Sequence, residues 1–93
     1  MQGYVIIARD ELKQEIKKSY GTVASYCRRV KIGGLYRTRS YVNQIVNQLV
    51  SVSEDRAKEI AKTLGGQTSD YFYYLPVVEW TLHKIARLSE SIK

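Results

Sequence analysis

The side chains with the clearest capacity for specific hydrogen bonding lie in the stretch TRSYVNQIVNQL, residues 38–49. It contains two Asn-Gln pairs, which begin at Asn43 and Asn47, and it has Arg39 near its start. A primary amide presents a hydrogen-bond donor and an acceptor side by side, and a guanidinium presents a fork of donors. These side chains can recognise a partner molecule through hydrogen bonds to its donors and acceptors. Amide side chains on a helix more often only form its solvent-exposed face. The rest of the sequence must therefore distinguish a solvated face from a recognition surface.

Apolar residues are interleaved with these polar ones at the spacing of an amphipathic helix. They recur at i, i+3, i+4 and i+7: Val42, Ile45, Val46 and Leu49. We expect them to fasten a helix over residues 38–49 to the core. The opposite side of that helix carries polar residues: Ser40, Gln44 and Asn47, with Asn43 beside them.

Two helices are expected before this stretch. Asp10 can cap the first, which has an apolar stripe with a spacing of four and ends at Gly21. Thr22 can cap the second, in which apolar residues again recur at i, i+3, i+4 and i+7: Val23, Tyr26, Cys27 and Val30. The pair Gly33-Gly34 then marks a turn, and the residues on either side of it could pair as a small hairpin.

Three helical segments are expected after it. Ser53 can cap a helix that ends at Gly65, and a short helical turn follows over residues 69–75. Pro76 suits the first position of a last helix that runs to the end of the chain. Residues 2–8 are expected to be an extended lead-in or one short strand. The sequence thus predicts an all-α fold in one domain, residues 1–93.

The charge of the chain is concentrated around the amide-rich helix. The net charge is +6, and residues 13–48 contain eight basic residues and only one acidic residue, Glu15. Such a region attracts polyanions such as nucleic acid or an anionic membrane surface, although it could serve solubility alone. The single cysteine, Cys27, indicates a reducing compartment, and the apolar run at residues 4–7 is too short for a signal peptide or a membrane span. A cytoplasmic location is therefore expected.

Catalysis is not expected. The chain has one cysteine and one histidine, His83, and no glycine-rich phosphate loop precedes a helix. We expect no catalytic residues, no metal site, no cofactor and no small-molecule substrate. Cys27 is expected to be a small core residue, and His83 a surface or interface residue.

The order of these segments resembles the lambda-repressor-like (Cro/repressor, or XRE) helix-turn-helix family of phages and bacteria. LKQEIKKSYGTVASYC resembles its first two helices, RSYVNQIVNQ its third, VSEDRAKEIAKTLGG its fourth, and TSDYFYYL lies where its fifth helix would be. The resemblance covers about residues 9–75 and implies a bundle of about five short helices, with an extra C-terminal helix over 76–93. The turn before the third helix is about five residues too long, roughly 33–37, which makes it either an extra DNA contact or a tolerated insertion.

The resemblance implies that helix 38–49 enters the major groove of double-stranded DNA, where amides match adenine and arginine matches guanine. Base contacts are then expected from five residues: Arg39, Ser40, Asn43, Gln44 and Asn47. Phosphate contacts are expected from basic and hydroxyl side chains: Lys17, Lys18, Thr22, Arg28, Arg29, Lys31, Arg37 and Thr38. Thr38 could instead cap the helix, and Asn47 could hold a phosphate instead of reading a base edge.

The last helix carries more apolar surface than docking on so small a body requires. We expect it to join two copies in a homodimer through Val78, Trp80, Leu82, Ile85, Leu88 and Ile92. The function implied is that of a sequence-specific, repressor-like transcriptional regulator. Two alternatives stay open: a protein-interaction module of antirepressor or antitoxin type, and an architectural DNA-binding protein without sequence choice.

Overall fold

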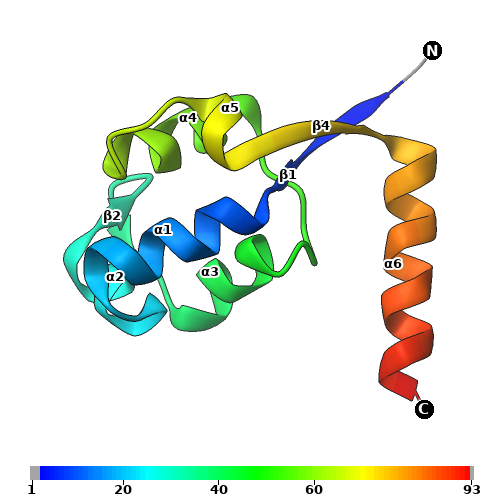
Figure 1. Cartoon of the computed structure of the whole chain (residues 1–93), viewed down its shortest axis with the longest axis horizontal. Coiled ribbons are helices and arrows are strands. Elements are labelled where there is room, and N and C mark those ends of the chain that lie inside the picture. The colour runs from blue at the N-terminus through cyan, green and yellow to red at the C-terminus, as the bar shows by residue number, and fades with distance from the viewer. Residues whose placement is uncertain (1–2, 93) are drawn as a thin grey trace.

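The computed structural model describes residues 3–92, with side chains described as far as residue 86. In these residues the chain forms six helices and four strands (Figure 1). The first half contains β1 (Tyr4–Ala8), α1 (Asp10–Tyr20), α2 (Val23–Arg29), β2 (Lys31–Ile32) and β3 (Leu35–Tyr36). The second half contains α3 (Arg39–Val46), α4 (Glu54–Thr63), α5 (Thr68–Tyr71), β4 (Phe72–Pro76) and α6 (Val77–Ile92).

The prediction of an all-α fold is wrong. Two small antiparallel sheets are present, one made of β1 and β4 and the other of β2 and β3. The helix expected over residues 69–75 ends at Tyr71, and Pro76 closes β4 instead of opening the last helix. The reason is that YVIIA and FYYLP are both rich in β-branched and aromatic residues, and each gives the other a partner, with Ile6 opposite Tyr74.

The helical stripes predicted from the sequence form the core. Helices α1 to α4 each bury one face, and the core residues come from these helices and from β1, β2, α5 and β4: Ile6, Ala8, Leu12, Ile16, Tyr26, Cys27, Ile32, Val42, Ile45, Val46, Ala57, Ile60, Ala61, Tyr71 and Phe72. β1 is central to this arrangement because it pairs with β4 on one side, while on the other its Ile6 carbonyl accepts a hydrogen bond from the Val52 N–H.

Three of the predicted helix caps are confirmed and one is wrong. The hydroxyls of Thr22, Thr38 and Ser53 each accept a hydrogen bond from the backbone N–H three residues later, at the start of α2, α3 and α4. Asp10, expected to cap α1, is instead its first helical residue, and Arg9 occupies the cap position. Nε of Arg9 donates to backbone carbonyls of α5 and β4, which ties the start of α1 to both.

The hairpin that could form around Gly33-Gly34 is present. β2 and β3 pair with Lys31 opposite Tyr36 and Ile32 opposite Leu35. Both glycines have positive φ, 65° and 80°, as a tight two-residue hairpin turn requires. The long connection between α2 and α3 is thus an ordered element.

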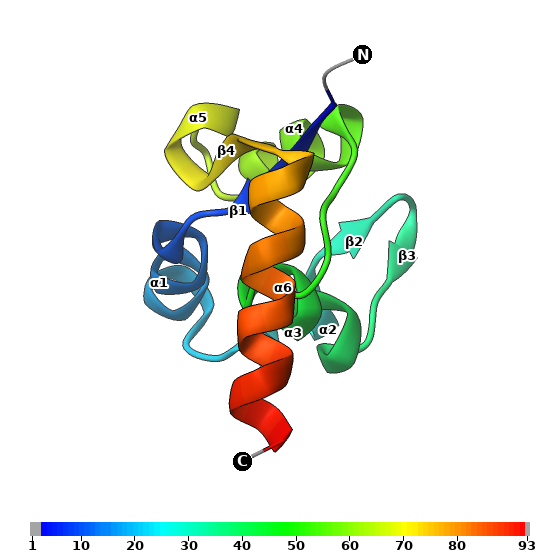
Figure 2. The same ribbon diagram turned by 90° about the vertical axis from the view of Figure 1, so that its right-hand side faces the viewer.

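Helix α6 stands to one side of the body. It follows directly from β4 and contacts the rest of the molecule through β4 and β1 (Figures 1 and 2). The Val77 N–H donates a 3.0 Å hydrogen bond to the carbonyl of Gly3, which fixes its first turn. Among the described residues, no helix combines the length and apolar character needed to cross a membrane.

Candidate nucleic-acid interface

The α3 helix is fixed to the core by three of its four expected apolar residues. Val42, Ile45 and Val46 are each at most 4% exposed. At its start, the Thr38 hydroxyl accepts a 3.1 Å hydrogen bond from the Tyr41 N–H. A hydrogen bond of 3.6 Å from the Cys27 thiol to the Thr38 carbonyl links this start to α2. The orientation of α3 is therefore set at both its face and its first turn.

The helix is shorter than predicted. It ends at Val46, not Leu49, because Gln48 adopts a positive φ of 62° and reverses the chain. The Leu49 N–H then bonds back to the Gln44 carbonyl at 2.9 Å, and the Gln48 N–H to the Ile45 carbonyl at 3.1 Å, the pattern of a Schellman motif. Leu49 lies beyond the helix and is 44% exposed, so its expected place in the core is wrong.

Gln48 holds this helix end against the sheet. Its Nε2 donates a 2.8 Å hydrogen bond to the carbonyl of Ala8, the last residue of β1. An αL residue other than glycine costs about 1 kcal/mol or more, and the side-chain bond offsets part of that cost. No local pattern indicates this contact, because the two residues are 40 positions apart in the chain.

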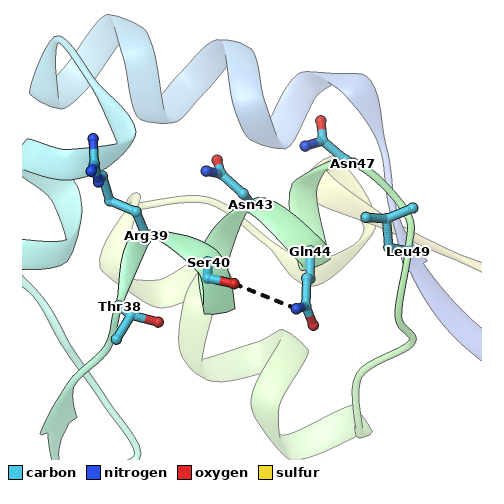
Figure 3. A pocket seen from close by; sticks show the side chains of 7 residues that line it. All are labelled: Thr38, Arg39, Ser40, Asn43, Gln44, Asn47 and Leu49. Carbon is cyan, nitrogen blue, oxygen red and sulfur yellow. Dashed lines mark hydrogen bonds between the residues drawn. The ribbon is translucent and has the colours of Figure 1, made fainter.

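An open depression of about 650 Å³ lies along the polar side of α3. It is lined by Thr38, Arg39, Ser40, Asn43, Gln44, Asn47 and Leu49, and so contains all five residues expected to contact bases (Figure 3). Arg39, Asn43 and Asn47 follow one another along the helix, and Ser40 and Gln44 lie in a second row. The expected reading residues thus share one solvent-facing surface.

The hydrogen-bonding groups of this surface are largely unused within the chain. Gln44 Nε2 lies 3.5 Å from the Ser40 hydroxyl, at the outer limit of a hydrogen bond. For the side chains of Arg39, Asn43 and Asn47, no hydrogen bond or ion pair is found to any described residue. Their donors and acceptors are available to a partner.

The segment that carries α2, the hairpin and α3 is free of acidic residues. No Asp or Glu occurs between Glu15 and Glu54, a stretch that contains seven basic residues: Lys17, Lys18, Arg28, Arg29, Lys31, Arg37 and Arg39. Six of them are exposed, and Arg37 is half-buried. Arg29 lies over the Tyr20 ring and Lys31 over the Tyr36 ring, at 5.4 and 5.3 Å from the ring centroids. Contacts of this kind orient a cation without neutralising it.

Three of the residues expected to bind phosphate also have a structural role. Thr22 and Thr38 use their hydroxyl oxygens as helix caps, although a capping hydroxyl keeps its own proton to donate. Arg37 donates from Nε to the Ile32 carbonyl at 2.8 Å, and its guanidinium lies 4.9 Å from the Tyr41 ring centroid. Arg37 therefore bridges the hairpin and α3.

A second bridge, which the sequence did not reveal, runs from α4. Arg56 donates a 3.0 Å hydrogen bond to the Tyr41 hydroxyl and lies 3.7 Å from the Glu59 carboxylate. The other oxygen of Glu59 accepts a 2.6 Å hydrogen bond from the Gly33 N–H at the hairpin tip. These side chains connect α4, α3 and the hairpin. Their partners are 15 and 26 residues away in sequence, so no spacing within one element could indicate them.

Cys27 is a core residue, as expected. It is 6% exposed, and burial raises the pKa of its thiol, although Arg39 and Arg28 act in the opposite direction. A thiol with a raised pKa stays protonated near neutral pH and is a poor nucleophile.

The apolar residues expected on one side of α6 divide into two groups. Val78, Leu82 and Ile85 are 71%, 62% and 54% exposed and follow a spacing of four and three. Trp80 lies on the opposite side of the helix, is half-buried, and has the Lys84 ammonium 4.4 Å from its ring centroid. Leu88 and Ile92 lie outside the described side chains. The described stripe is thus narrower than the predicted surface.

Comparisons with protein-family models, with curated proteins and with solved structures find no match to this chain.

Proposed function

We propose that this protein is a sequence-specific DNA-binding regulator that places α3 in the major groove of double-stranded DNA. One observation carries the proposal: Arg39, Ser40, Asn43, Gln44 and Asn47 line one open surface, and this surface lies within a segment without acidic residues. The acid-free segment supplies attraction to a polyanion, and the amides of Asn43, Gln44 and Asn47 supply the means to distinguish bases.

The dimensions of α3 suit a groove. With its side chains an α-helix is about 10–12 Å in diameter, which fits the roughly 12 Å width of the B-DNA major groove. The eight residues of α3 make it about 12 Å long at 1.5 Å per residue. The helix is held from behind by buried side chains, so its polar side can be pressed into a groove without unfolding. α2 precedes it, as the first helix of a helix-turn-helix does.

The proposed readers have distinct roles. Asn43 and Gln44 can each donate to and accept from the N6/N7 edge of adenine, and Arg39 can donate twice to O6 and N7 of guanine. Ser40 completes the surface with a hydroxyl and Asn47 with a third amide. A good bidentate contact contributes about 1–3 kcal/mol of discrimination against the wrong base.

The basic side chains supply affinity for the backbone. Each phosphate neutralised changes the slope of log K against log salt by about −0.9. If all six basic residues expected to bind phosphate do so, the five exposed ones and Arg37, the slope would be about −5. Exposed residues are the first candidates: Lys17, Lys18, Arg28, Arg29 and Lys31. Thr22, Arg37 and Thr38 would add contacts while keeping their roles in the fold.

The regulator is proposed to act as a homodimer, joined through the exposed stripe Val78, Leu82 and Ile85 of α6. Two copies related by a two-fold axis would bind two half-sites about one helical turn apart. On the resemblance of its helical segments, we also propose a relationship to the Cro/repressor helix-turn-helix family and a place in bacterial or phage-infected cytoplasm.

Selection of bound duplexes from a random pool tests this function. The expected result is an enriched motif of two inverted half-sites, because both base reading and two-fold symmetry contribute. Enrichment without a motif would favour the architectural alternative, since charge alone attracts every sequence equally. No retention of duplex at micromolar protein and low salt would contradict DNA binding and favour a protein-interaction module, for which the exposed α6 stripe would be the contact surface.

A further inference from the structure

The β2–β3 hairpin is the feature that reading by α3 leaves unexplained. Nine residues, 30–38, separate α2 from α3, where a helix-turn-helix needs a turn of only about 3–4 residues. If the extra residues were only a tolerated insertion, we would expect an irregular and mobile surface loop. This one is built as a hairpin and anchored.

Contacts to the core and to α4, and a bond within the connection itself, hold the hairpin in a fixed position. Ile32 is 1% exposed and belongs to the core. Arg37 donates to the Ile32 carbonyl at 2.8 Å, and the Gly33 N–H donates to Glu59 on α4 at 2.6 Å. The outer surface of the hairpin is therefore presented at a defined place beside α3 (Figure 2).

That outer surface combines positive charge with exposed apolar groups. Leu35 and Tyr36 are 59% and 60% exposed, and the Lys31 ammonium lies 5.3 Å from the centroid of the Tyr36 ring. Lys31 and Tyr36 are the cross-strand pair farther from the glycine turn. A partner that complements them must offer both an anion and an apolar patch. The sugar–phosphate backbone of DNA offers both in every nucleotide.

The hairpin lies close enough to α3 to reach the same DNA. Only three residue steps separate Tyr36 from Arg39, the first residue of α3, a span of at most about 11 Å. The N-terminal half of a reading helix lies deepest in the groove, and the groove is about 12 Å wide. With α3 in the groove, Tyr36 and Lys31 would lie at the backbone that borders it.

We propose that the β2–β3 hairpin is a second DNA-contacting element, in which Lys31 binds a phosphate and Tyr36 packs against the adjoining sugar. The proposal rests on the proposed function of α3 and extends it. Because the backbone is the same for every sequence, this contact adds affinity and lengthens the protected site without changing which bases are preferred.

The test compares a double variant, Lys31→Ala with Tyr36→Ala, with a matched control, Lys62→Ala with Tyr74→Ala. Both remove one cation and one tyrosine, and Tyr36 and Tyr74 are 60% and 59% exposed. β4, which carries Tyr74, lies on the opposite side of the body from β2 (Figure 1). Melting temperature should change little in either, since the substituted side chains are on the surface.

Two readouts on the selected DNA site are informative: hydroxyl-radical protection of the backbone, and affinity as a function of salt. We expect the wild type to protect sugars outside the bases read by α3. The hairpin variant should lose this protection, bind about tenfold more weakly and have a salt slope smaller by about 1. Its ranking of DNA sequences should match the wild type, and the control variant should bind like the wild type.

A hairpin variant with wild-type affinity and footprint would overturn this proposal while leaving reading by α3 intact. An altered ranking of sequences would also overturn it, because the contact would then involve bases. If the hairpin changes weaken binding but Asn43→Ala with Gln44→Ala leaves the preferred sequence unchanged, reading by α3 fails and the hairpin contact stands. No DNA binding by the wild type would overturn both. Should the double variant unfold, Lys31→Glu tests the same contact by charge repulsion.

Discussion

At the scale of single residues, the polar side chains differ in what they already bind within the chain. The side chains of Asn43 and Asn47 have no hydrogen-bond partner among the described residues, whereas those of Thr38 and Arg37 are held in the fold. Substitutions in the first group should change recognition with little effect on stability. Substitutions in the second group should change stability whether or not DNA is present. Measuring both DNA binding and stability of each variant therefore distinguishes the two groups of residues.

Thr38→Ala should destabilise the protein by about 1 kcal/mol, because it removes the hydroxyl that caps α3. Thr38→Ser keeps that hydroxyl and should stay close to the wild type. Urea unfolding of the free protein measures both. Equal stability of the alanine variant and the wild type would show that this cap contributes nothing.

Tyr26 should make stability fall at high pH. Burial raises the pKa of its hydroxyl to about 12 from the usual 10, so the unfolded chain releases this proton more easily than the folded chain. The stabilisation is complete below pH 10 and is lost as pH rises from 10 towards 12, by up to about 3 kcal/mol. Unfolding free energies measured across this range should show the fall, and Tyr26→Phe should reduce it. The burial of Tyr71 also raises the pKa of that hydroxyl, so the Phe variant should keep a smaller slope.

At the scale of elements, the helices α1 to α4 could be predicted because their signals are local. Apolar spacing and the caps Thr22, Thr38 and Ser53 all lie within a few residues of the helix they define. The β1–β4 sheet could not be predicted in this way. Strand β4 follows directly after α5, and its partner lies more than 60 residues earlier, so only tertiary pairing decides between a longer helix and a strand.

The expected reading surface was predictable for a similar reason. Its members lie on one side of one helix, so the 100° step between residues brought them together before any tertiary contact was known. The end of α3 was not predictable. Gln48 leaves the helix through a positive φ and is held by a carbonyl of β1, neither of which apolar spacing could indicate.

The anchor of the hairpin should depend on the acceptor at Glu59. Glu59→Ala removes the partner of the Gly33 N–H, so this amide should exchange its hydrogen faster and the protein should lose about 1 kcal/mol. Glu59→Gln keeps an oxygen acceptor and should protect the amide better than Ala does. Native-state hydrogen exchange followed by NMR gives the answer, and unchanged exchange at Gly33 in the Ala variant would exclude the anchor.

At the scale of the whole molecule, α6 is the element least integrated with the body. Val78, Leu82 and Ile85 expose an apolar stripe with the four-and-three spacing of paired helices. Burial of such an exposed apolar stripe against a second copy of the chain is energetically favourable. A dimer would also double the number of DNA contacts along one duplex.

Leu82→Lys should therefore weaken self-association at least tenfold, because it places a charge in the centre of the stripe. Ala86→Lys adds the same charge at an exposed position one turn after Leu82, at the edge of the stripe and not in its centre, and should change association less. Sedimentation equilibrium over a range of protein concentrations measures both. A wild type that stays monomeric at high micromolar concentration would contradict the proposed dimer.

The most direct test of reading by α3 is the specificity ratio, the affinity for the selected site divided by that for random duplex, at one salt concentration. The variant Asn43→Ala with Gln44→Ala should lower this ratio by roughly tenfold or more, at about 1–3 kcal/mol per contact. Arg28→Ala should weaken binding to both duplexes alike and flatten the salt slope by about 1. A specificity ratio that stays at the wild-type value in the Asn43 and Gln44 double variant would contradict the account.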